Sequence, residues 1–237
     1  MNSMEEKLNE RMAAKAQAMV TRRQSDRAFQ PGKLSSRERI EKLVDPGSFQ
    51  ELDLLLTSAE SDLDRSAGGI PSDGVITGYA EVNGRPLFVW SQDGDVLGGS
   101  VGVIHAKKMT WLYEKALQMR TPVVGIVDSI GERAADLIEY PRFYSLESVC
   151  QLQVAASGVI PQIVMVMGPC VGAMAIVAAM ADFVFMVRET SYMHIAPPRK
   201  ESAVRRWVRH ACTPERPGAV MSWLTTIVTA LRNAEGY

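Results

Sequence analysis

The feature that most constrains the fold is an uncharged, almost wholly apolar run of nineteen residues, IVMVMGPCVGAMAIVAAMA, from Ile163 to Ala181. A run of this length can cross a bilayer as a helix. Gly168-Pro169 in its middle argues against that, because proline has no N–H and disfavours helical backbone in the residue before it. Residues 163–167 are partly β-branched, which is typical of a buried strand, whereas residues 173–181 are rich in helix-favouring alanine and methionine. We therefore predict a strand ending at Gly168-Pro169, then a helix, then a further buried strand over residues 183–187.

The overall composition favours a globular chain with a sizeable core. Hydrophobic residues make up 46% of it, charged residues 22%, and the formal net charge is -1. This balance gives no electrostatic reason to expect a nucleic acid or a membrane as partner. Cys150, Cys170 and Cys212 are scattered without a C-x-x-C pair, so we expect neither a metal site nor a disulfide framework. The first 24 residues are charged throughout, unlike a signal peptide, and we expect a cytoplasmic protein.

Further along the chain, strand and helix patterns alternate from Gly74 to Val187, which indicates an α/β fold. We divide the chain into an N-terminal helix and linker (1–30), a main domain (31–198) and a divergent tail (199–237). In LSSRERIEKLVDPGSF, Ser35 or Ser36 should cap a helix. The other predicted elements are a hairpin around Asn83-Gly84, helices over 100–118 and 141–157, and a buried strand over 121–129.

Three glycine-containing turns in this region share one design. They are Gly98-Gly99-Ser100, Ser129-Ile130-Gly131-Glu132 and Gly168-Pro169-Cys170-Val171-Gly172. The first turn of a helix leaves backbone N–H groups unpaired, and glycine lets a ligand approach them closely. Two such groups aimed at one oxygen form an oxyanion hole, which suits a thioester becoming an enolate. From spacing alone, ordinary glycine turns remain the alternative.

Several motifs in order resemble the N-terminal half of a carboxyltransferase. They are LSSRERIEKLVDPGSF, DGVITGYAEVNGRPLFVWSQDGDVLGGSVGVIHAKK, TPVVGIVDSIGER and ASGVIPQIVMVMGPCVGAMAIVAAMADFVFMV, and the likeness extends from Pro31 to Pro198. Specifically, they resemble the β subunits of biotin-dependent acyl-CoA carboxylases of the propionyl-CoA and methylmalonyl-CoA type. The resemblance implies a crotonase-like (ClpP/crotonase) α/β fold in two halves, the first binding acyl-CoA and the second carboxybiotin.

The chemistry that the resemblance implies needs no side-chain base. Carboxybiotin releases CO2, the acyl-CoA loses an α proton to biotin, and the enolate attacks CO2 while backbone N–H groups stabilise it. The donors carry over to Gly131, Glu132, Gly172 and Ala173. This chain departs from the family's Asp-Ser-Gly-Gly-Ala-Arg, because Ile130 and Glu132 replace small residues, and Ala173 replaces a glycine. The negative charge of Glu132 would destabilise the developing enolate unless its side chain points away from the site.

Other residues have secondary roles in this interpretation. Gly98, Gly99, Ser100 and Lys107 are the expected substrate-binding residues; His105, Lys107 and Lys108 either meet a CoA phosphate or form a solvated helix face. Cys170 has no histidine partner that would make it a nucleophile. We expect Arg133 to pair with Asp128 or Glu132, and Trp90 and Trp111 to lie in the core.

The resemblance also implies partners. They are an acyl-CoA, a biotin carrier and biotin carboxylase subunit that bears the biotin, the C-terminal carboxyltransferase half, and further copies of the chain in a homo-oligomer. Two other functions stay open. One is a non-catalytic acyl-CoA-binding or assembly module, and the other is a single-half crotonase-type decarboxylase or hydratase using Glu132 or Glu139.

The tail after Pro198 resembles nothing in the family as it stands. When each codon is read from the last base of its predecessor, residues 206–213 can encode Leu-Gly-Ala-Ala-Arg-Val-His, where the family commonly has Leu-Gly-Gly-Ala-Arg-Val-His. Residues 220–227 can likewise encode His-Val-Val-Ala-Asp-Asp-Asp, close to a later family motif. We interpret the tail as frameshifted; a real C-terminal helix over PGAVMSWLTTIVTALRNAEGY is the alternative. On either interpretation the carboxybiotin half is expected to be missing.

Overall fold

A computed structural model describes residues 33–58, 70–139, 145–188 and 190–195. The predictions for residues 1–30 and for the tail 199–237 lie outside the described residues, as does Cys212. None of the described helices combines the length and the apolar character that a membrane span requires.

One mixed sheet organises the chain, in the order β1-β2-β3-β4-β5-β6 with β7 beside β5. The first three strands are antiparallel, and β3, β4, β5 and β6 run parallel. The hairpin between β2 and β3 turns at Asn83-Gly84, as predicted. The strands are β1 (Gln50–Leu52), β2 (Val75–Val82), β3 (Arg85–Gln92), β4 (Val123–Ser129), β5 (Gln162–Val171), β6 (Phe183–Met186) and β7 (Tyr192–His194).

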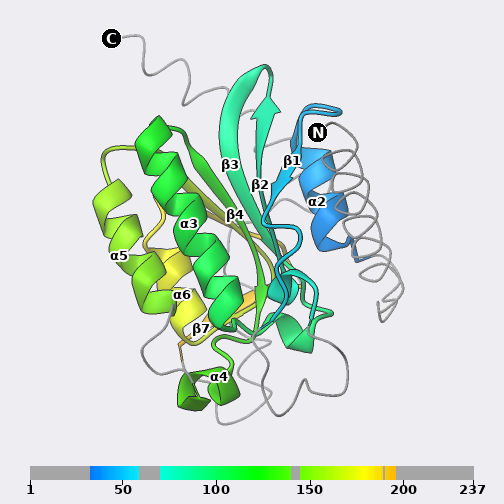
Figure 1. Cartoon of the computed structure of the whole chain (residues 1–237), viewed down its shortest axis with the longest axis vertical. Helices are drawn as coiled ribbons and strands as arrows, with labels where there is room; N and C mark the ends of the chain where they lie inside the picture. Colours follow the sequence, from blue (N-terminus) through cyan, green and yellow to red (C-terminus); the bar gives the residue numbers. More distant parts are fainter. Residues whose placement is uncertain (1–32, 59–69, 140–144, 189, 196–237) are drawn as a thin grey trace, which may run out of the picture.

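Helices cover both faces of this sheet, which confirms the predicted α/β class. The longest, α3, begins at Val103 rather than Ser100, and α2 begins with the predicted Ser35 cap, reinforced by Glu38 in a capping box. Helices α3, α5 and α6 pack on one face and α2 on the other (Figure 1). The helices are α2 (Ser36–Leu43), α3 (Val103–Met119), α4 (Ala134–Glu139), α5 (Leu146–Ala156) and α6 (Ala173–Ala179), with short 3-10 turns η1 (Ser72–Gly74) and η2 (Leu97–Gly99).

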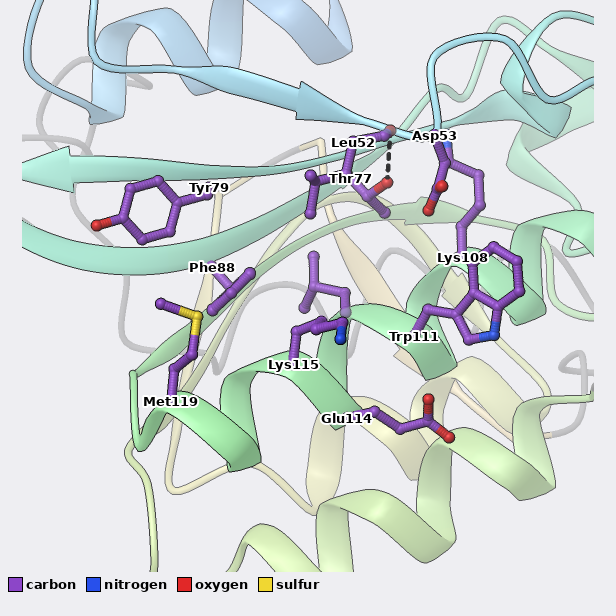
Figure 2. Close-up of a pocket in the computed structure, with 11 residues that line it drawn as sticks. Leu52, Asp53, Thr77, Tyr79, Phe88, Lys108, Trp111, Glu114, Lys115 and Met119 are labelled. Carbon is purple, nitrogen blue, oxygen red and sulfur yellow. Dashed lines mark hydrogen bonds between the residues drawn. The ribbon is translucent and has the colours of Figure 1, made fainter.

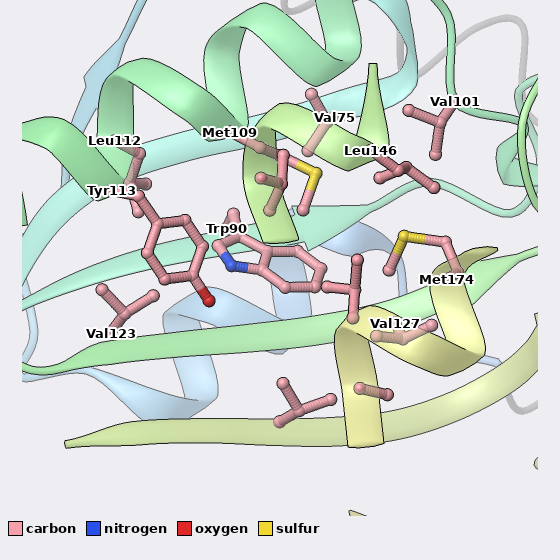
Figure 3. Close-up of a cluster of buried hydrophobic side chains, with 14 of the residues drawn as sticks. Val75, Trp90, Val101, Met109, Leu112, Tyr113, Val123, Val127, Leu146 and Met174 are labelled. Carbon is pink, nitrogen blue, oxygen red and sulfur yellow. The ribbon is translucent and has the colours of Figure 1, made fainter. Parts of the chain in front are cut away.

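The larger core lies between the sheet and α3, α5 and α6 (Figure 3). Trp90 is fully buried in it, as predicted, beside Tyr113 and Met109. A Cβ on Gly125 of the neighbouring strand would lie 2.1 Å from Cζ2 of Trp90. The indole of Trp90 therefore occupies the space that a side chain at Gly125 would need.

The prediction that Gly168-Pro169 ends a strand is wrong, because β5 continues through it to Val171. What changes at this point is the neighbour of β5: residues before Gly168 pair with β6, and residues from Pro169 onward pair with β7. Gly168 is required for a different reason, since a Cβ there would lie 2.1 Å from Oδ1 of Asp128. The break in the apolar run marks a change of strand partner and makes room for a buried carboxylate.

Strand β6 forms where a strand was predicted, but it is not buried. Phe183 and Val184 are 38% and 37% exposed, because β6 is the last strand on its side of the sheet. Edge strands leave one side open to solvent or to another chain.

Candidate active site

The three glycine turns lie side by side at the carboxyl ends of the parallel strands. The first two are joined by backbone hydrogen bonds: the Ile130 N–H donates to the Gly98 carbonyl (3.1 Å) and the Val101 N–H to the Gly131 carbonyl (2.8 Å). The Arg133 N–H then donates back to the Val101 carbonyl (2.8 Å). Ligands of parallel α/β sheets commonly bind at this end of the strands.

The third turn packs directly against the second. A Cβ on Gly131 would lie 2.9 Å from the Val171 carbonyl oxygen and 3.8 Å from Cα of Gly172. Gly131 has φ +102° and Gly172 has φ +64°, values that residues with a Cβ rarely adopt. The two pairs that the sequence singled out, Gly131-Glu132 and Gly172-Ala173, are therefore brought together.

The hydrogen bonds distinguish between these four backbone donors. The Gly131 N–H donates to Oγ of Ser129 (3.1 Å), and the Gly172 N–H donates to the His194 carbonyl (3.1 Å). Within the described part of the chain, no hydrogen bond uses the N–H of Glu132 or Ala173. Ala173 is the first residue of α6, a position whose N–H has no partner within the helix and lies at the positive end of the helix dipole. Of the four groups, the N–H groups of Glu132 and Ala173 are thus the two without a hydrogen-bond partner among the described residues.

The carboxylate of Glu132 points to another helix. Its Oε1 accepts a hydrogen bond from the Leu146 N–H (3.3 Å), at the start of α5. Ser145, the N-cap residue of α5, makes no side-chain hydrogen bond to the helix, and the Glu132 carboxylate caps α5 in its place. A carboxylate at a helix N-terminus is favourably placed in the helix dipole. The charge is therefore stabilised by α5, while the backbone N–H of Glu132 makes no hydrogen bond to a described residue.

The predicted pairing of Arg133 with Asp128 or Glu132 is wrong. Arg133 is buried and pairs with Asp73, Nη1 to Oδ1 at 2.8 Å, and with Asp136, Nη1 to Oδ2 at 3.5 Å. Burial raises the pKa of Asp73, and the Arg133 charge and the His105 N–H oppose that rise. A buried arginine held by two carboxylates fixes the end of the second turn.

The same two carboxylates cap α3. Oδ2 of Asp73 accepts the His105 N–H (2.9 Å), and Oδ2 of Asp136 accepts the Val103 N–H (3.0 Å). The N-cap residue itself is Gly102, and a Cβ there would lie 2.5 Å from Asp73 and 2.6 Å from Asp136. Glycine at the cap position therefore makes room for side chains supplied from elsewhere in the chain.

The first turn uses its polar groups within the protein. The N–H groups of Gly99 and Ser100 donate to the carbonyls of Val96 (2.8 Å) and Leu97 (3.2 Å). Oγ of Ser100 accepts from Nε of Arg133 (3.3 Å). Gly98 and Ser100 thereby hold the second turn in place, and Gly98 also lines a cavity described below.

The alternative prediction, that the basic residues of α3 form a solvated face, is wrong for His105 and Lys108. His105 and Lys108 are fully buried, with Nζ of Lys108 donating to Oγ of Ser72 and to the Val75 carbonyl, both at 2.8 Å. Burial, and then the charges of Arg133 and Lys108, lower the pKa of His105 to about 3. Lys107 remains partly exposed, with Nζ 4.4 Å from the ring centre of Trp111.

A cavity of about 590 Å³ opens beside the turns, on the side of the sheet that α2 covers. Its charged residues are Lys33, Arg39 and Asp128; Arg39 and Lys33 contact the same oxygen of Asp128, at 2.8 and 3.0 Å. The sequence signal for this cluster was weak: Arg39 stands beside Ile40 on the buried side of an otherwise polar helix. The remaining lining is Leu34, Gly94, Gly98, Ile130, Met167, Gly168, Pro169, Val187, Thr190 and Tyr192.

A second cavity, of about 610 Å³, lies between the β2–β3 hairpin and α3 (Figure 2). Its walls are mainly apolar, including the edge-to-face pair Tyr79–Phe88 with ring centres 5.6 Å apart. Trp111 lines this cavity and is only partly buried, so the prediction that it is a core residue is wrong.

Cys170, in the third turn, is not an activated nucleophile. It is fully buried, and burial raises the pKa of its thiol to about 12. The thiolate that nucleophilic catalysis needs is therefore absent at neutral pH. This agrees with the expectation from the sequence.

Known proteins share this arrangement of elements. The chain matches the carboxyl transferase domain family over residues 27–215. It is 41% identical over 198 residues to the propionyl-CoA carboxylase beta chain of Roseobacter denitrificans, covering 84% of this chain and 38% of that one. It is 37% identical over 193 residues to the methylmalonyl-CoA decarboxylase subunit alpha of Veillonella parvula, covering 81% of this chain and 37% of that one.

Among solved structures, transcarboxylase 12S with methylmalonyl-coenzyme A and methylmalonic acid bound superimposes with a TM-score of 0.74 at 27% identity. The superposition covers 94% of this chain and 47% of that one. It confirms the crotonase-like fold. The chain spans about 38% of the length of the Roseobacter denitrificans protein. Its residues 27–215 are the part that matches the carboxyl transferase domain. It therefore belongs to the carboxyl transferase domain family.

Proposed function

We propose that the chain is the acyl-CoA-binding half of a biotin-dependent carboxyltransferase. It would move a carboxyl group between carboxybiotin and the α-carbon of a short acyl-CoA, propionyl-CoA or acetyl-CoA. The observation that carries this proposal is the pair of available N–H donors, Glu132 and Ala173, on two turns that pack against each other. Family membership supports the reaction class.

In this mechanism the chain binds and orients the thioester. The N–H groups of Glu132 and Ala173 donate to the thioester oxygen, and their hydrogen bonds strengthen as negative charge develops there in the enolate. Gly131 and Gly172 leave space for that approach because neither has a side chain. The Gly98-Gly99-Ser100 turn supports the site, and Lys107 is the proposed cation for a CoA phosphate.

The side chains near the donors fit a reaction whose base comes from elsewhere. The Glu132 carboxylate is bound at α5, and the Cys170 thiol is protonated at neutral pH. Biotin, carried by a partner carrier protein, would supply the carboxyl group and accept the proton. The C-terminal half that would bind it, and the homo-oligomer that would complete the site, are proposed partners. The orientation of Glu132 also disfavours that hydratase or decarboxylase alternative in which Glu132 is the acid or base.

The test is carboxyl exchange between malonyl-CoA or methylmalonyl-CoA and biotin, measured with this chain and a supplied C-terminal half. Ala173→Pro removes one proposed donor at the first helical position, where proline is tolerated. We expect exchange to fall by about 10²–10³-fold, the usual effect of losing one oxyanion donor. Ala173→Ser keeps the N–H and is the matched control, which should stay near the native rate. Equal rates for the two variants would exclude Ala173 as a donor.

A non-catalytic acyl-CoA-binding module is the second candidate. The observation that favours it is Ile130, which replaces a small family residue and is 53% exposed beside the donors. This function predicts that acyl-CoA binds in calorimetry while exchange stays absent with any supplied C-terminal half. Recovery of exchange in an Ile130→Gly variant would identify the side chain as the obstacle and restore the first proposal.

A further inference from the structure

The cavity beside the turns has a charged floor and apolar walls. Asp128 and Arg39 are buried within it, whereas the Lys33 side chain is 27% exposed. Ile130 and Pro169 belong to the second and third turns, so the cavity adjoins the proposed thioester site. Its volume of about 590 Å³ is within the range of small-molecule sites.

One atom on this floor has no hydrogen-bond partner. Nη2 of Arg39 donates to Oδ2 of Asp128 at 2.8 Å, but Nη1 of Arg39 is buried and makes no hydrogen bond to any described residue. Buried charged donors are normally satisfied, and the guanidinium group matches carboxylate and phosphate oxygens. Because Arg39 lines the cavity, a ligand in the cavity is a natural source of the missing acceptor.

The shape of the cavity is set by glycines around Asp128. A Cβ on Gly94 or Gly168 would lie 2.5 or 2.1 Å from Oδ1 of Asp128. The carboxylate therefore lies where those side chains would be and holds Arg39 by its Nη2 side. The walls, which include Leu34, Met167 and Val187, suit an apolar group rather than a hydrated ion.

From these observations we propose that this cavity binds the oxyanion end of an organic ligand, with Arg39 Nη1 as a donor. The proposal rests on the proposed function in one respect, because there the ligand would be a carboxylated acyl-CoA. The oxyanion is then either the free carboxylate of its acyl group or a phosphate of its CoA.

Calorimetric titration of the full chain with malonyl-CoA, acetyl-CoA and CoA separates these two sources. If the carboxylate is bound, malonyl-CoA binds at least tenfold more tightly than acetyl-CoA, and the gap closes in Arg39→Met. If a phosphate is bound, all three compounds lose affinity to a similar degree in that variant. The matched control is Arg37→Met on the same helix, because Arg37 pairs with Glu51 outside the cavity and should change nothing.

Arg39→Met leaves Asp128 without its arginine, so a second variant, Arg39→Met with Asp128→Asn, removes both charges. Circular dichroism establishes that each variant is folded. If both folded variants bind every compound as Arg37→Met does, the proposal is overturned.

Titration with free malonate and inorganic phosphate tests the cavity independently of CoA. If no CoA compound binds, the proposed function fails. Malonate or phosphate binding that is lost in Arg39→Met would still support the oxyanion site. Absence of binding by every probe would overturn both.

Discussion

Replacing Gly168 by alanine should destabilise the protein strongly, although the same change in a strand often has the opposite sign. The φ angle of Gly168 is not in the left-handed region, so its backbone conformation is open to alanine. At such a position Gly→Ala usually stabilises the folded protein by about 0.4–1 kcal/mol. Here the new Cβ would lie 2.1 Å from Oδ1 of Asp128. Overpacking of this kind costs about 1–3 kcal/mol, and displacing a carboxylate from a buried arginine adds to it, up to about 3–5 kcal/mol for complete separation. We expect a loss of about 2–4 kcal/mol.

A double-mutant cycle with Asp128→Ala tests the cause. Removing the Asp128 side chain takes away the atoms that the new Cβ meets, so Gly168→Ala should be close to neutral in that background. The assay is urea unfolding followed by tryptophan fluorescence, to which the buried Trp90 contributes. The free energies of unfolding are compared between variants whose denaturant slopes are equal. The reasoning fails if Gly168→Ala is neutral in the native background. It also fails if the cost is equal in the two backgrounds.

Three further predictions concern stability. The pKa of His105 is about 3 in the folded chain and 6.5 in the unfolded chain, so on acidification the unfolded chain binds the proton first. The free energy of unfolding should therefore fall by about 1.4 kcal/mol per pH unit as pH drops from about 6.5 toward 3. Urea midpoints measured between pH 7 and 4 should fall less steeply in His105→Gln, which lacks this titration. Glu132→Ala should cost about 1 kcal/mol by removing the α5 cap, with Glu132→Gln retaining most of it, and equal melting temperatures for the two would contradict the cap assignment. Trp90→Ala should cost about 3–5 kcal/mol in urea unfolding, and a loss below 1 kcal/mol would mean that the core shown in Figure 3 collapses around the gap.

Local sequence signals predicted those parts of the fold that local chemistry determines. The Asn83-Gly84 hairpin, the Ser35 cap and the apolar strands around Val124 and Val164 all depend on residues close in the chain. The pairing of the Gly131 and Gly172 turns was implied only by the resemblance to carboxyltransferases. The structure gives the reason, because the turns follow β4 and β5, neighbouring parallel strands whose carboxyl ends lie at one edge of the sheet.

Long-range partners could not be predicted in the same way. The choice of Asp73 by Arg133, over the adjacent Glu132, depends on η1 and α3 meeting in space. The burial of His105 and Lys108 depends on the same contact, since both bond to residues 72–75. The continuity of β5 through Gly168-Pro169 depends on β7, which arrives later in the chain.

The resulting structure places an ionic cluster at each end of the turn that carries Glu132, the proposed donor. Before the turn, Asp128 is held by Arg39 and Lys33; after it, Arg133 is held by Asp73 and Asp136. Buried ion pairs contribute little net stability, so their value at this site lies in fixing geometry. A backbone donor can stabilise an enolate only if it is held in place before the charge develops. The two clusters therefore supply from distant parts of the chain the rigidity that a glycine turn lacks.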